Sequence, residues 1–152
     1  MTIRFAKPRH AERPPTCTVI RDDGSTTGQA TSDFFVAHDL THYAVETELG
    51  LRQAFFGLLN SGLTFESFTD RQAGSAKART LPEDAYLAEC IVGALDAQRY
   101  DPSISDEDVM LQLGPFAEKV GIAQLQNIRR VRDEHLRAYA ALPAGATLEL
   151  AF

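Results

Sequence analysis

The chain carries the stretch FVAHDLTHYAVETELG at residues 35–50, which predicts a helix from about residue 37 to residue 49 that ends at Gly50. Two histidines, His38 and His42, stand four residues apart, and Glu46 follows after four more. At about 100° per residue, these three side chains fall within about 80° of one another on successive turns. The sequence therefore predicts a helix that buries an apolar face and gathers two imidazoles and a carboxylate on another.

Imidazole nitrogens and carboxylate oxygens are the usual ligands of zinc and of other divalent transition metals. We therefore predict a metal site with His38, His42 and Glu46 as ligands and a water molecule in an open position. Tyr43, on the same helix, and His135, on the inward side of a later helix, are candidates to support these ligands from behind. Because a metal-bound water ionises near neutral pH, hydrolysis is the chemistry that such a site favours.

The segment HDLTH, residues 38–42, resembles the H-E-x-x-H helix of the zincin metalloproteases. The resemblance covers five residues and implies that His38 and His42 bind zinc, with Asp39 at the position of the glutamate that acts as general base. Asp39 is therefore the candidate catalytic residue, although its side chain is one methylene shorter and no downstream G-x-x-H supplies the third ligand of the metzincins. The longer string HDLTHYAVE is similar to a helix of small uncharacterised bacterial proteins, which implies a bacterial origin and no particular activity.

The same residues fit a second interpretation, in which no metal is bound. Histidines four apart occur on many helices as partly buried polar residues, and Asp39 could cap a helix that begins after His38. The protein would then be a non-enzymatic interaction or assembly module. It would present an apolar segment, such as LRQAFFGLLNSGLTFESF at residues 51–68, to a partner or to a second copy of itself as a homo-oligomer.

Length and composition limit the fold and the class of partner. The 152 residues, 44% hydrophobic and 24% charged, predict a single globular domain. A net charge of −6 disfavours nucleic acid, and the arginines of residues 129–137 alternate with acidic residues, so we expect them on a solvated helix side. No apolar run is long enough to span a membrane and no signal-peptide core is present, so we expect a cytoplasmic address.

Several cofactor classes lack their motifs. The chain has no G-x-x-x-x-G-K-[ST], no G-x-G-x-x-G after a strand and no G-x-S-x-G, and it shows no nucleotide, flavin or haem signature. Cys17 and Cys90 belong to no C-x-x-C pair, so we expect two small buried residues and neither a disulfide nor a thiolate zinc site.

Strand patterns lie at the two ends of the chain and helix patterns lie between them. Alternating or β-branched segments occur at residues 2–5, 16–21, 26–32 and 147–152. We therefore predict an α+β fold in which about five helices pack beside a small antiparallel sheet formed by the N- and C-terminal segments.

The helices after residue 50 are predicted from their periodicity and caps. They span about 51–61, then from a Thr80 capping box to Tyr100, then the segment after Ser105, and finally about 122–141, with a mobile loop at 71–79. The wide apolar face of the helix that ends at Tyr100 favours a central position for it. Its polar residues Glu89 and Asp96 lie opposite that face and are expected to be solvated.

Overall fold

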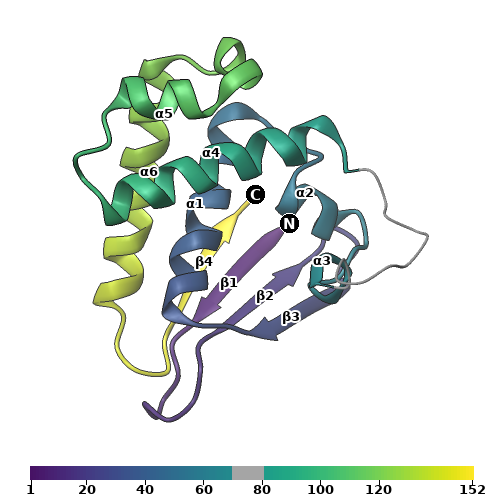
Figure 1. Cartoon of the computed structure of the whole chain (residues 1–152). Coiled ribbons are helices and arrows are strands. Elements are labelled where there is room, and N and C mark those ends of the chain that lie inside the picture. The colour runs from purple at the N-terminus through teal and green to yellow at the C-terminus, as the bar shows by residue number, and fades with distance from the viewer. Residues whose placement is uncertain (70–80) are drawn as a thin grey trace.

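The computed structural model describes residues 1–69 and 81–152, in which a four-stranded antiparallel sheet is covered on one face by helices (Figure 1). The strands are β1 (Thr2–Ala6), β2 (Thr16–Ile20), β3 (Thr26–Ala30) and β4 (Thr147–Ala151). The α-helices are α1 (Asp33–Leu49), α2 (Phe55–Asn60), α3 (Glu66–Thr69), α4 (Glu83–Tyr100), α5 (Asp106–Gln112) and α6 (Ile122–Ala141). The predicted α+β class, with a sheet made from both ends of the chain, is confirmed.

The sheet has the order β3-β2-β1-β4, so the C-terminal strand pairs with the N-terminal one. Four side chains of its covered face are fully buried: Ile3, Phe5, Cys17 and Val19. The opposite face is polar, and on it Arg4 Nε lies 2.7 Å from Glu149 Oε1 across the β1–β4 pair. The alternation seen in the sequence therefore divides a buried face from a solvated one.

Helix α1 begins earlier than the sequence predicted. Ser32 caps it by accepting a hydrogen bond from the Phe35 backbone N–H at 3.3 Å, and Gly50 ends it with a left-handed φ of 66°. His38 consequently lies in the second turn, well inside the helix, and Asp39 does not cap it. This geometry excludes the interpretation in which the helix begins after His38.

Helix α1, and not α4, is the central helix. One side of it contributes Val36 and Leu40 to the hydrophobic cluster that packs on the sheet. The other side contributes Ala44 and Val45 to a second cluster, formed with α4, α5 and α6. The sequence assigned the central position to α4, because the buried polar side chains of α1 made its apolar faces look narrow. Figure 1 shows α1 enclosed between the sheet and α4.

Helix α2 begins at Phe55, four residues after the predicted start at Leu51. Its first turn has no side-chain cap of its own. The carboxylate of Glu46 on α1 takes that place and accepts hydrogen bonds from the backbone N–H groups of Phe56 at 3.0 Å and Gly57 at 3.4 Å. The start of α2 is therefore set by a contact with another helix, which no local sequence signal encodes.

Buried arginines tie the outer elements together. Arg21, after β2, donates to the Leu59 carbonyl at 2.6 Å and so holds the end of α2 on the sheet. Arg132 is only 6% exposed and donates to the Leu95 carbonyl at 3.4 Å, while Arg129 binds the carboxylate of Asp106. The prediction that the arginines of α6 lie on a solvated side is therefore wrong for Arg129 and Arg132.

The remaining helices follow their sequence signals closely. Ser105 forms a capping box with Asp108 at the start of α5, and α6 spans the predicted residues. Between them, Gly114–Lys119 forms a short 3-10 helix. The predicted cap Thr80 and the predicted loop at 71–79 lie outside the described residues. Among the described helices, none is long and apolar enough to cross a membrane.

The two cysteines differ in their surroundings. Cys17 is fully buried in the sheet, as predicted, and burial raises the pKa of its thiol far above the ordinary range. Cys90 lies on the outer face of α4 and is exposed, so its prediction as a buried residue is wrong. Cys90 follows the exposed Glu89 on α4, and both side chains face away from the second cluster.

Two glycines within helices give opposite predictions for stability. A methyl group on Gly57 would overlap the backbone carbonyl of Arg52, whereas Gly93 on α4 has open space at the same position. We expect Gly57→Ala to lower the free energy of unfolding by about 1–3 kcal/mol, as overpacking does. Gly93→Ala should raise it by up to about 1 kcal/mol through helix propensity. Urea denaturation measures both, and a Gly57→Ala protein as stable as the parent would contradict the placement of α2.

Candidate metal site

Two helices bring three potential metal ligands together. His38 and His42 of α1 and Glu89 of α4 each offer one ligand atom, and these atoms lie within 4.8 Å of one another. The two imidazole centroids are 4.9 Å apart, and His42 Nε2 lies 3.7 Å from Glu89 Oε1. Within residues 1–69 and 81–152, no other group of three or more such side chains meets this criterion. The group is therefore compact enough to hold a divalent cation.

The first imidazole is oriented by a carboxylate on α4. His38 Nδ1 lies 2.8 Å from Asp96 Oδ2 in a partly buried hydrogen bond. Burial lowers the pKa of His38, but the hydrogen bond and the negative charge of Asp96 outweigh that effect and the pKa is raised overall. With Nδ1 bound to Asp96, the other nitrogen, Nε2, is left as the donor atom for a metal.

The second imidazole is backed by a carboxylate on its own helix. His42 Nδ1 lies 3.3 Å from Glu46 Oε1, and both side chains are almost completely buried. The two atoms are close, but no hydrogen bond joins them, and His42 Nδ1 has no hydrogen-bond partner among the described residues. Glu46 lies on the Nδ1 side of the ring, and Glu89 lies on the Nε2 side.

Burial sets the charge of this second pair. It lowers the pKa of His42 to about 4, against the opposing influence of Glu89. It also raises the pKa of Glu46 to about 8, although the backbone amides of Gly57 and Phe56 favour the ionised carboxylate. His42 is therefore a neutral imidazole at pH 7, which is the form that binds metal ions.

The third member of the group differs from the sequence prediction. Glu46 was the expected third ligand, but its oxygens face the amides of α2 and Nδ1 of His42. The structure brings Glu89 to the outer nitrogens instead, with 53% of its side chain exposed. Sequence reasoning had placed Glu89 and Asp96 in solvent, and Asp96 is in fact only 8% exposed. Their spacing of seven residues, two turns of α4, was the sequence signal that both carboxylates lie on one face of this helix.

A small cavity of about 190 Å³ opens beside the group. Its polar wall includes His38, His42, Glu89, Asp39 and Gln29. Its apolar wall consists of four phenylalanines from α1, α2, α3 and the residue that precedes α3: Phe35, Phe55, Phe68 and Phe65. The candidate ligands thus border a half-open pocket with an aromatic wall, and small-molecule sites are usually concave and lined by apolar and aromatic side chains.

Asp39, the candidate catalytic residue, lies in the wall of this cavity. It is 4% exposed, and its Oδ2 has no hydrogen-bond partner among the described residues. Burial raises the pKa of Asp39 to about 7; the positive charge of His38 opposes this shift, and the charges of Glu46 and Glu89 add to it. A buried carboxylate oxygen without a partner is costly, so Asp39 is poised to meet a donor from outside the chain.

Tyr43 and His135, predicted to support the ligands, lie elsewhere. The Tyr43 hydroxyl donates to the Ala151 carbonyl at 2.9 Å, and its ring packs edge-on against His135 with the centroids 5.2 Å apart. Both side chains therefore lie between α1, α6 and β4. Neither belongs to the group formed by His38, His42 and Glu89, so we assign neither to the site.

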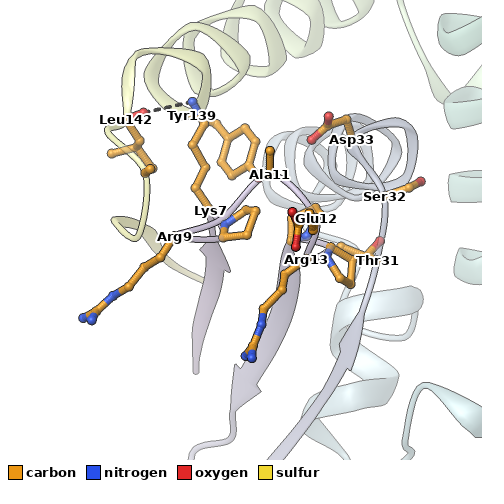
Figure 2. Close-up of a pocket in the computed structure, with 14 residues that line it drawn as sticks. Lys7, Arg9, Ala11, Glu12, Arg13, Thr31, Ser32, Asp33, Tyr139 and Leu142 are labelled. Carbon is orange, nitrogen blue, oxygen red and sulfur yellow. Dashed lines mark hydrogen bonds between the residues drawn. The ribbon is translucent and has the colours of Figure 1, made fainter.

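A larger hollow of about 720 Å³ lies between the loop after β1, the start of α1 and the end of α6 (Figure 2). In its wall Lys7 Nζ donates to the Leu142 carbonyl at 2.9 Å, while Arg9 and Arg13 extend outward from the loop. The residues that line it include no histidine and no cysteine. Volume alone would favour this hollow, but the titratable groups that could support chemistry converge on the smaller cavity.

The buried carboxylate of Glu46 gives a stability prediction. Glu46→Ala would leave the amides of Phe56 and Gly57 without an acceptor, and we expect it to cost about 2–4 kcal/mol, because each such buried donor costs about 1–3 kcal/mol. Glu48→Ala is the matched control on the same helix, since the hydrogen bond that Glu48 accepts from Asn127 is exposed. It should cost less than about 1 kcal/mol. Equal losses in thermal denaturation of the two variants would show that Glu46 does not hold α2.

Comparison of the chain with protein-family models, with curated proteins and with solved structures finds no match. No catalytic residue can therefore be carried over from a relative. The likeness of residues 38–42 to the zincin helix covers the two histidines alone, because Asp39 replaces the glutamate and the third group comes from α4. The function has to be argued from the geometry of the site.

Proposed function

We propose that the protein binds one divalent transition-metal ion, with zinc as the first candidate, between His38, His42 and Glu89. The observation that carries the proposal is the close approach of the three ligand atoms, together with the hydrogen bond between Asp96 and Nδ1 of His38. Glu46 lies 3.3 Å from Nδ1 of His42 without forming a hydrogen bond to it. Metal-binding histidines characteristically direct their second nitrogen to a carboxylate or a carbonyl, which fixes the ring and strengthens it as a ligand.

The donor set favours a catalytic metal over a structural one. Structural zinc sites are closed by four protein ligands, whereas two histidines and one glutamate are typical of hydrolytic zinc sites that keep a water. The same set also suits non-haem iron. Here the open side of the group borders the cavity that Phe55 and Phe65 help to line. A substrate in that cavity would reach the fourth position of the metal.

The reaction that this arrangement supports best is hydrolysis. When bound, a divalent ion would lower the pKa of its water to near neutrality, and the ion would also polarise the bond under attack. The contributions of the chain are to hold the ion through two rigid helices, to exclude bulk water with the phenylalanines and to keep His42 neutral by burial. Sequence-based assignment of Asp39 as the general base stays a prediction within this proposal.

Metal analysis tests the proposal directly. The purified parent protein, loaded with zinc and dialysed, should retain about one ion per chain, and His42→Ala should retain none. Asp96→Asn should weaken binding by about 10- to 100-fold, the loss typical of a removed orienting partner. His135→Ala is the matched control, because this imidazole lies outside the group. Isothermal titration with zinc measures all four proteins.

Substoichiometric zinc in the parent protein, or equal retention by the parent and His42→Ala, would rule the proposal out. A loss in Glu46→Gln as large as that in His42→Ala, with Glu89→Gln unchanged, would instead identify Glu46 as the third ligand. The two glutamate variants therefore distinguish the ligand set predicted from the sequence from the one that the geometry favours.

A second candidate function is association through exposed aromatic side chains. Four of them are 46–65% exposed: Phe34, Phe35, Tyr86 and Tyr100. Phe35 lines the cavity beside the site, and the ring of Phe34 stacks with that of Tyr100. The segment proposed from the sequence is a poorer surface, because Phe56 and Phe65 are buried. Light scattering of the parent protein and of Tyr100→Ser measures this directly. A concentration-dependent dimer that the substitution abolishes would favour the assembly module.

A further inference from the structure

The cavity beside the candidate metal ligands has a distinct chemical character. Four phenylalanine rings form its apolar wall, and the carboxylates of Asp39 and Glu89 lie in its polar wall. None of the described residues that line it is lysine or arginine. Before a metal binds, the described lining offers the carboxylates of Asp39 and Glu89 against one imidazole, that of His38, which can carry a positive charge, so it favours a cationic ligand over an anionic one.

Asp39 is the residue that points to a particular ligand group. Its side chain is more than nine-tenths buried, yet Oδ2 has no hydrogen-bond partner among the described residues. Such an orphaned oxygen is costly in an aromatic environment unless a donor fills the space beside it. One donor on the adjacent residue, Nδ1 of His38, is bound to Asp96.

The aromatic rings narrow the choice of donor further. The face of a phenylalanine ring attracts a cation, and cages of such rings are a recurring way to bind organic ammonium groups. Phe55 packs against two of the other lining rings, with its centroid 5.9 Å from that of Phe65 and 5.0 Å from that of Phe68. A carboxylate beside a set of aromatic faces is therefore complementary to an ammonium group on an apolar body.

The size of the cavity limits the body of the ligand. Apolar cavities of about 150 Å³ hold a single benzene ring. The cavity here is about 190 Å³, which leaves room for one ring or a short branched chain together with one small polar group. Larger molecules would have to extend past Glu89, the exposed member of the group.

We propose that the cavity takes a small primary amine with a single apolar or aromatic body, whose ammonium group pairs with Asp39 among the phenylalanine rings. The inference rests on the proposed metal function, because the reacting bond of such a substrate would face His38, His42 and Glu89. Recognition of the ammonium group is a different role from general base. A recognition residue is needed for binding, and a general base only for turnover.

Benzylamine, benzyl alcohol and benzoate form a matched series of probes with one ring and a changing polar group. Titration of the ¹⁵N-labelled, metal-free parent protein, followed by NMR, should show benzylamine binding with a Kd of about 1 mM, about what a ligand of this size reaches. Benzyl alcohol should bind at least tenfold more weakly, and benzoate should not bind. Shifted amides should lie around Asp39, Phe55 and Phe65.

Asp39→Asn keeps the shape of the side chain and removes its charge. It should weaken benzylamine at least tenfold while leaving benzyl alcohol unchanged and leaving zinc retention at one ion per chain. Benzoate that binds as tightly as benzylamine to the parent protein, or an Asp39→Asn protein that binds benzylamine as the parent does, would overturn the inference. The ligand series on the parent protein decides the matter even where the variant fails to fold.

Metal-free and zinc-loaded protein are compared so that the two proposals fail separately. If benzylamine binds only to the zinc-loaded protein, and equally well to its Asp39→Asn variant, then it binds as a nitrogen ligand of the metal. That result contradicts the inference and supports the metal site. Benzylamine that binds through Asp39 in a protein unable to retain zinc contradicts the metal function and supports amine recognition. Zinc retention without benzylamine binding contradicts the inference alone.

Discussion

Helix α1 is enclosed on nearly every side, so its polar side chains must find their partners inside the protein. Thr41 donates to the Ala37 carbonyl of its own helix at 2.9 Å. Glu46 accepts a hydrogen bond from a backbone amide at the start of α2, and His38 is hydrogen-bonded to the carboxylate of Asp96 on α4. These contacts decide where α2 begins and which face of α4 meets α1. The candidate site is thus a consequence of how a polar helix is buried.

The part of the site that lies on one helix could be predicted from the sequence, because helical periodicity is local. His38 and His42 do share a face of α1, as their spacing indicates. Glu89 and Asp96 could not be found in the same way, since their place depends on the packing of α4 against α1. A carboxylate on the polar side of a helix looks solvated until the neighbouring helix is known. The hydrogen-bond partners of Glu46 could not be predicted for the same reason, because these amides are on α2.

For the fold, too, the features set by adjacent residues were predicted, and those set by the packing of distant segments were not. The strands and the limits of α6 were predicted, because alternation and capping residues are written into adjacent positions. The centre of the fold was misjudged: α4 has the wider apolar stripe, but its described residues contribute to one hydrophobic cluster, whereas α1 contributes to both, as α6 does. The prediction of burial from periodicity counts apolar residues alone. It therefore underestimates the burial of a helix whose buried side chains include the polar residues His42 and Glu46.

The most direct test of this account is to locate a bound metal. Crystals grown with zinc and measured at the zinc absorption edge should show one strong anomalous peak between α1 and α4. It should lie about 2.0–2.1 Å from a nitrogen of His38 and of His42 and about 2.0–2.2 Å from an oxygen of Glu89. Zinc-grown crystals with no peak at these three side chains, or with peaks only at exposed carboxylates on the surface, would contradict it.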